Sequence, residues 1–222
     1  MINIAIDGPS GAGKSSLAKA LAKKLDYIYV DTGALYRAVG LFVRSKEVEP
    51  TNMAEVEKLL PLISLELDYE NGVQTVYLNG ENVNEKIRTP EMSMYASAVS
   101  AHPPVRTFLL DLQKNIAKKH NVIMDGRDIG TVILPDAQVK IYLFADNESR
   151  AKRRYEELLQ KGEKVTLESV LEEMNLRDHN DSTRKTAPAV QAPDAIPLNN
   201  SQLDFEGTVD AALEIIGKVL GK

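Results

Sequence analysis

A glycine-rich segment near the beginning of the sequence has the residue types and spacing that bind phosphate. Residues 8–15 read GPSGAGKS and fit the pattern G-x-x-x-x-G-K-[ST]. Glycines let successive backbone N–H groups converge on phosphate oxygens, and the N-terminus of a helix favours the same negative charge. Lys14 would reach the β- and γ-phosphates of a nucleotide, and the Ser15 hydroxyl would bind Mg²⁺. The expected nucleotide-binding residues are Gly8, Pro9, Ser10, Gly11, Ala12, Gly13, Lys14, Ser15 and Ser16.

The same segment could be an ordinary glycine-rich turn with an exposed lysine, but its neighbours favour the nucleotide site. The apolar run 2–6 precedes it and predicts a short strand. Leucine and alanine residues follow at helical spacing between positions 17 and 25. Strand, loop and helix therefore stand in the order that a phosphate-binding loop requires.

Two further polar segments come directly after predicted strands. Residues 31–37 (DTGALYR) follow the strand 27–30, and residues 125–131 (DGRDIGT) follow the apolar strand 122–124. The carboxyl ends of strands line the ligand cleft in a parallel sheet, so both segments are expected there. Asp125 has the position of a carboxylate that holds Mg²⁺ directly or through water. The alternative makes Asp125 a helix cap and Arg127 a surface cation.

The elements that must position these residues alternate strand and helix, which predicts an α/β fold with a parallel sheet flanked by helices. The region 64–87 departs from this rhythm, because Asn71-Gly72 and Asn79-Gly80 predict two hairpin turns. We expect a small antiparallel sheet there, inserted in the parallel series. The remaining predicted elements are helices at 53–60, 90–100, 103–119, 147–161 and 166–181, a strand after the Pro135-Asp136 turn, an edge strand at 195–198, and a C-terminal helix.

Composition limits the classes of function that this chain can have. The chain has 222 residues, a net charge of −5 and no cysteine. Disulfides and cysteine-ligated metal sites are therefore excluded. The negative charge argues against broad binding to duplex DNA or to an anionic membrane. Because the first residues, MINIAIDG, do not read as a signal peptide, we expect no export and a cytoplasmic protein. We also expect a monomer without nucleic-acid or membrane partners.

Taken together, these motifs resemble those of the bacterial cytidylate kinases, a branch of the nucleoside monophosphate kinases. The resemblance extends over essentially the whole chain, and the hairpin insertion is also a feature of this branch. Its combination of DTGALYR with DGRDIGT is specific, whereas the phosphate loop alone would not be. The matching segments are 8–16, 31–37, 87–89, 105–106, 125–131 and 177–181.

The resemblance implies an organisation and an activity. It implies transfer of the γ-phosphate of ATP to CMP or dCMP, with Mg²⁺ as cofactor. The implied parts are a P-loop NTPase-type core (about 1–40, 105–147 and 189–222), a monophosphate-binding subdomain with the insertion (about 41–104) and a helical lid (about 148–188).

The resemblance also implies roles for individual side chains. Arg37, Arg88 and Arg127 would hold the acceptor phosphate, and Arg184 would lie against the transferring or acceptor phosphate. Thr32, Ser97, Arg106 and Asp128 would read the cytosine, and Arg177 and Asp181 would contact the ribose. The implied substrate-binding residues are Thr32, Tyr36, Arg37, Arg88, Ser97, Arg106, Arg127, Asp128, Arg177, Asp181 and Arg184, and the catalytic candidates are Lys14, Arg127, Asp128 and Arg184.

Some of these residues have an alternative interpretation. Ser97 lies among alanines and could be a small residue that permits close packing of helices. Arg177, Asp181 and Arg184 share one helix face and could form an exposed ion-pair ladder.

Three lid arginines also share one helix face. Arg150, Arg153 and Arg154 could clamp phosphate, or they could belong to a solvated face that pairs with nearby glutamates. The residues themselves favour neither interpretation.

Two other classes of protein share part of this pattern. A P-loop kinase for a small metabolite such as shikimate or gluconate would share the donor site, but it would not account for the insertion or for the number of acceptor-side arginines. A GTPase-type switch would need a guanine-reading N-K-x-D element, which the sequence lacks.

Overall fold

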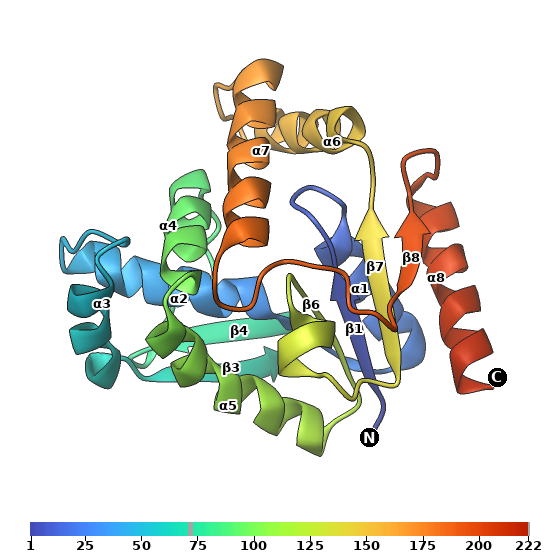
Figure 1. The fold of residues 1–222 in the computed structure, drawn as a ribbon, viewed down its shortest axis with the longest axis horizontal. Coiled ribbons are helices and arrows are strands. Elements are labelled where there is room, and N and C mark those ends of the chain that lie inside the picture. The colour runs from blue at the N-terminus through green and yellow to red at the C-terminus, as the bar shows by residue number, and fades with distance from the viewer. Residues whose placement is uncertain (71–72, 222) are drawn as a thin grey trace.

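The computed structural model describes residues 1–70 and 73–221, and a parallel sheet forms its centre (Figure 1). The strands lie in the order β2-β6-β1-β7-β8, and each adjacent pair runs parallel. The predicted edge strand is confirmed, because β8 contains Pro197 and borders the sheet. The strands span β1 (Asn3–Asp7), β2 (Ile28–Asp31), β6 (Val122–Gly126), β7 (Val139–Phe144) and β8 (Ile196–Asn199).

Helices cover both faces of this sheet, so its central strands are buried on both sides. One face packs against α1 (Lys14–Leu25) and α8 (Phe205–Leu220), and the other packs against α5 (Pro103–Lys119) and the π-helical turn η2 (Ile129–Ile133). Sequence patterns did not predict η2. Because side chains alternate along a strand, Asp7 faces η2 and Asp125 faces α1.

The inserted antiparallel sheet is confirmed by β3 (Leu65–Glu70), β4 (Val73–Leu78) and β5 (Glu81–Asn82). Asn79 and Gly80 both have positive φ, 50° and 81°, as a tight hairpin turn requires. The predicted Asn71-Gly72 turn lies outside the described residues. A second hydrophobic core joins this sheet to α2 (Thr32–Ser45), α3 (Met53–Leu59), the short 3₁₀ turn η1 (Leu60–Leu62) and α4 (Pro90–Ser100).

Two helices, α6 (Asn147–Gln160) and α7 (Leu167–Thr183), stand over the carboxyl ends of the strands (Figure 1). A side chain caps the start of each helix. Asp146 caps α6, and a capping box of Thr166 and Ser169 caps α7. A small apolar cluster around Leu158 and Met174 holds the two helices together. None of the helices within 1–70 and 73–221 is long and apolar enough to cross a membrane.

Candidate functional site

The loop between β1 and α1 has a backbone that only glycine adopts without strain. Gly8 has φ 149°, and a Cβ atom there would lie 1.9 Å from the carbonyl oxygen of Leu143. Gly11 has φ 70°, and a Cβ atom there would lie 2.6 Å from Cε of Met174 in α7. The Lys14 Nζ atom donates to the carbonyl oxygen of Pro9 at 2.7 Å, so the lysine folds back over the loop. These glycines thus let the loop pack tightly against β7 at Gly8 and against α7 at Gly11.

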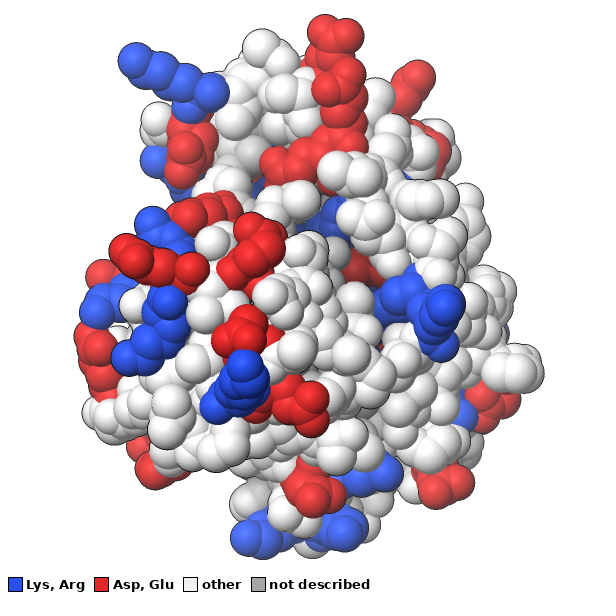
Figure 2. Space-filling view, turned by 60° about the vertical axis from the view of Figure 1, so that its left-hand side comes forward, with Lys and Arg blue, Asp and Glu red and all other residues white. Residues whose placement is uncertain are grey.

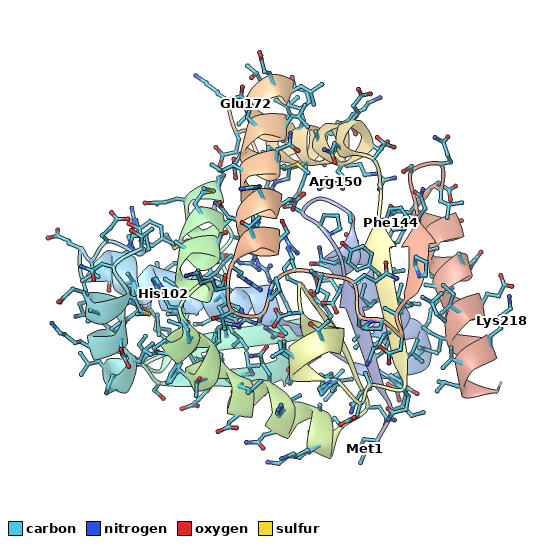
Figure 3. The ribbon with its side chains drawn as sticks, in the orientation of Figure 1. Met1, His102, Phe144, Arg150, Glu172 and Lys218 are labelled. Atoms are coloured by element: carbon cyan, nitrogen blue, oxygen red, sulfur yellow. The ribbon has the colours of Figure 1, made fainter. Side chains whose placement is uncertain are left out.

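The two helices above the sheet grip this loop at Ser10. The Ser10 N–H donates to Asp178 Oδ1 at 2.8 Å, and the Ser10 carbonyl accepts from Arg150 at 2.6 Å. Arg150 also donates to Asp178 Oδ2 at 2.6 Å and lies between α6 and the loop (Figure 3). Because only 4% of Arg150 is exposed, its assignment to a solvated face is wrong. Arg154, in contrast, pairs with Glu157 at 2.9 Å, which agrees with a solvated face.

One cavity of about 840 Å³ runs from this loop to arginines of α2, α5 and α7. The surface brought forward in Figure 2 carries acidic and basic side chains interspersed, whereas the cavity concentrates arginines. Gly8 and Pro9 border a separate, smaller cavity instead, and Ala12 borders neither. The other predicted site residues line the large cavity: Ser10, Gly11, Gly13, Lys14, Ser15, Ser16, Thr32, Tyr36, Arg37, Arg88, Ser97, Arg106, Asp125, Arg127, Asp128, Arg177, Asp181 and Arg184.

Asp31, at the end of β2, holds two of these arginines. Its carboxylate accepts from Arg37 at 3.0 Å and from Arg88 at 2.7 Å, and it also caps α2 through the N–H of Ala34. Burial raises the pKa of Asp31, but Arg37 and Arg88 outweigh burial and hold that pKa below its ordinary value. Asp31 is therefore a buried anion shared by two cations.

Asp128 and Asp181 hold further arginines deeper in the cavity. Asp128 pairs with Arg106 and, at 3.3 Å, with Arg184. Asp181 accepts from Arg127 at 3.0 Å. Burial raises the pKa of Asp181, yet Arg127 and the other arginines beside it lower that pKa overall. These are buried pairs, because both carboxylate side chains are 5% exposed, so the exposed ion-pair ladder is wrong.

The serines of α4 take part in the same network. Ser97 Oγ donates to Asp181 Oδ1 at 3.2 Å, and Ser100 Oγ accepts from Arg184 at 2.9 Å. Their hydroxyls thus contact charged groups of the cavity, which the interpretation of Ser97 as a small packing residue alone does not explain.

Positive charge remains in excess near the phosphate loop. Burial, together with the neighbouring Arg127, lowers the pKa of Arg177 to about 10. Burial also lowers the pKa of Lys14 well below its ordinary value, again with a contribution from Arg127. The Nε atom of Arg177 has no hydrogen-bond partner among the described residues. A bound polyanion would relieve this repulsion and complete the hydrogen bonding.

Ser15 and Asp125 form the part of the cavity that suits a magnesium ion. The Ser15 hydroxyl donates to Asp125 Oδ2 at 2.8 Å, and Tyr29 donates to Asp125 Oδ1 at 2.8 Å. Burial and the neighbouring Asp31 raise the pKa of Asp125. Because Asp125 accepts from a serine and a tyrosine, it is not a helix cap. Mg²⁺ in nucleotide sites takes one or two protein oxygens together with phosphates and water, so this small donor set fits it.

Asp7 is a buried carboxylate that sequence reasoning missed. Its two oxygens accept the N–H groups of Ile129 and Gly130 at 2.8 and 2.7 Å, directly after Asp128. Burial raises the pKa of Asp7 to about 6, although these two N–H groups oppose the rise. Asp7 thereby fixes the backbone that presents Arg127 and Asp128.

Other residues of the network also escaped the sequence analysis. The position of Asp7 and Asp31 at the ends of strands was a usable signal, because strand ends line the cleft. Gln74 in the insertion carried no signal, because nothing in its local sequence shows what it will contact. Asp178 stood in a segment that matches the family, but its contact with Ser10 was not predicted.

A phosphate loop at the carboxyl edge of a parallel sheet, with a cleft of arginines under two helices, defines a P-loop kinase. A solved structure of an uncharacterised protein from Eubacterium ventriosum has a similar fold, with a TM-score of 0.52, 15% identity, and coverage of 100% of this chain and 99% of that chain.

Residues 4–218 match the family described as cytidylate kinase. A cytidylate kinase of Caldicellulosiruptor saccharolyticus is 49% identical over 99% of this chain and 97% of its own. A cytidylate kinase of Carboxydothermus hydrogenoformans is 45% identical over 98% of each chain. The chain belongs to the cytidylate kinase family.

Asp7 predicts a specific dependence of stability on pH. Its folded pKa of about 6 exceeds the ordinary value of 3.8, so the folded state binds the extra proton between these values. Stability from this group therefore falls as the pH rises from about 4 to about 6, by roughly 3 kcal/mol. The free energy of unfolding of wild type minus that of Asp7→Asn, measured by urea denaturation, should decrease across this window. A difference that stays constant with pH would contradict the assignment.

The grip on Ser10 predicts an effect on nucleotide binding. Arg150→Met removes the charged donor to the Ser10 carbonyl and frees Asp178, so the loop loses its fixed shape. We expect affinity for an ATP analogue, measured by calorimetry, to fall by about tenfold or more. Lys152→Ala, an exposed change on the same helix, is the matched control and should bind normally. Equal affinity in both variants would show that α6 does not hold the loop.

Proposed function

We propose that this chain transfers the γ-phosphate of ATP to CMP or dCMP, giving ADP and CDP or dCDP. The observation that carries the proposal is a single cavity that contains both the phosphate loop and the acceptor-side arginines. Two polyanions can meet there only if their charge is neutralised, and the arginine cluster supplies that neutralisation. The names of the relatives support cytosine as the base.

On the donor side, the loop from Gly8 to Ser16 would bind the triphosphate, with Lys14 at the β- and γ-phosphates. Its helix N-terminus and convergent N–H groups suit that charge. Ser15 and Asp125 would hold Mg²⁺, which when bound neutralises charge on the phosphates. The 2.8 Å contact between these two side chains supports a shared ion site.

On the acceptor side, Arg37, Arg88 and Arg127 would bind the monophosphate, and Arg184 would lie beside the transferring group. Three of these four arginines are nearly buried, with side chains 6–16% exposed, so a phosphate among them would be largely shielded from water. The attacking group is already a phosphate oxygen, and no general base is required. Alignment and charge neutralisation are therefore the work of the protein.

Water must be kept out, because hydrolysis of ATP competes with transfer. We propose that residues 148–188 act as a lid, that residues about 41–104 bind the monophosphate, and that the remainder forms the core. The separate apolar cluster of α6 and α7 supports a lid that moves as a unit. We further propose a monomer that acts on free nucleotides.

Base recognition would come from Thr32, Ser97, Arg106 and Asp128, with Arg177 and Asp181 near the ribose. Cytosine carries an amine at N4, which a carboxylate accepts, whereas uracil carries an oxygen there. Arg106 lies over the ring of Tyr36, 5.5 Å from its centroid, and this stacking fixes the guanidinium. A kinase of shikimate or gluconate would have no use for so many buried arginines.

An acceptor screen tests the activity. ADP release at fixed ATP should be fastest with CMP and dCMP when these are compared with UMP, AMP, GMP, shikimate and gluconate. Lys14→Ala should lower turnover with CMP by about a hundredfold or more, because it removes charge that stabilises the transition state. Faster turnover of shikimate or gluconate, or full activity in a folded Lys14→Ala protein, would overturn the proposal.

Base choice should depend on Asp128. Asp128→Ala removes the acceptor for the N4 amine, which costs about 1 to 3 kcal/mol and lowers the ratio of kcat/KM for CMP over UMP by roughly one to two decades. Asp194→Ala removes an exposed carboxylate paired with Lys140 and should leave the ratio unchanged. If Asp128→Ala lowers both activities equally, Asp128 serves only to hold Arg106 and Arg184.

A further inference from the structure

Gln74 of the insertion reaches into the main sheet. Its Oε1 atom accepts the N–H of Asp31 at 2.8 Å, and its Nε2 atom donates to the carbonyl of Asp31 at 3.2 Å. Gln74 is 6% exposed and Asp31 is 3% exposed, so both hydrogen bonds are shielded from water. β2 borders the parallel sheet, and Gln74 satisfies its outer edge at this single residue, as a neighbouring strand would.

Asp31, whose backbone is bound by Gln74, also binds two arginines through its carboxylate. The carboxylate of Asp31 accepts from Arg37 and Arg88, which come from α2 and from the segment between β5 and α4. Without an anion between them, two guanidinium groups so close together would repel each other. Asp31 therefore fixes their separation, and Gln74 fixes the backbone of Asp31.

Arg37 can also donate a hydrogen bond to a further group. Its side chain lines the cavity and is 13% exposed, and its buried Nε atom has no hydrogen-bond partner within the described part of the chain. A donor that is buried and unsatisfied is costly unless something else accepts from it. A phosphate oxygen in the cavity would be such an acceptor.

We propose that Gln74 and Asp31 are positioning residues that hold Arg37 and Arg88 for the phosphate of the acceptor. The inference rests on the proposed function, because it assigns these arginines to the acceptor. In this arrangement the insertion is part of the acceptor site through one buried amide side chain. The donor site does not depend on that amide, because Lys14 and Ser15 are held by other contacts.

Steady-state kinetics of Gln74→Met tests this inference. Methionine keeps the length of the side chain and removes both hydrogen bonds to Asp31. We expect KM for CMP to rise about tenfold while KM for ATP stays the same. If methionine prevents folding, Gln74→Glu serves instead, because its added negative charge beside Asp31 competes for the arginines and should also raise KM for CMP alone. KM is measured for whichever monophosphate the wild-type protein uses, so a failure of CMP as substrate leaves the test intact.

A double-mutant cycle separates positioning from general loosening. If Gln74 acts through the arginines, Gln74→Met and Arg88→Met together should raise KM for the acceptor by much less than the product of their separate effects. Asn79→Gly is the matched control, because Asn79 also makes two hydrogen bonds to backbone, at Ser64 and Leu62, but at the other end of β4. It should leave KM for the acceptor unchanged. Multiplicative effects in the cycle, an equal rise in Asn79→Gly, or a matching rise in KM for ATP would overturn the proposal.

Discussion

The burial of positive charge is the constraint on which this structure depends. Lys14 and a group of arginines are gathered in one cavity, where desolvation disfavours their charged forms and mutual repulsion adds to that cost. Buried carboxylates offset this cost, and each of them pairs with two or more of the cations. These carboxylates are Asp31, Asp128 and Asp181, and they come from a strand end, a loop and helix α7. The cavity is thus organised by contacts within the chain, at the expense of buried ion pairs.

The parallel sheet explains why these groups can be shared. Its strands end at one edge, and the register aligns Asp31 with Asp125 and Asp7 with Gly126 across neighbouring strands. Because side chains alternate along a strand, Asp125 faces α1 and Asp7 faces η2, so these two carboxylates serve different faces of the sheet. A binding edge of this kind is rigid, because every strand that carries a charged residue is buried on both sides.

Local patterns in the sequence predicted the strand, loop and helix of the phosphate site, the parallel sheet, the insertion and the two helices α6 and α7. These features follow from spacing, turn residues and periodicity, which a single segment contains. The partners of the arginines could not be predicted in the same way, because Asp31 meets Arg88 across 57 positions and Ser10 meets Asp178 across 168. The turn η2 also escaped, since its π-helical form depends on the Asp7 carboxylate that receives its N–H groups. In the sequence, Gln74 is an ordinary polar residue of a hairpin strand. It has a partner only because β4 packs beside β2.

The phosphate loop and the arginines around Asp31 are held by different parts of the chain. Arg150 of α6 and Asp178 of α7 hold the loop at Ser10, whereas Gln74 of the insertion secures Asp31 and through it Arg37 and Arg88. A change in the inserted sheet therefore acts on Asp31 and its two arginines, while the contacts that hold the phosphate loop come from α6 and α7. Such a division lets the two sides of the cavity vary independently in evolution, because the residues that secure one side lie far along the chain from those that secure the other.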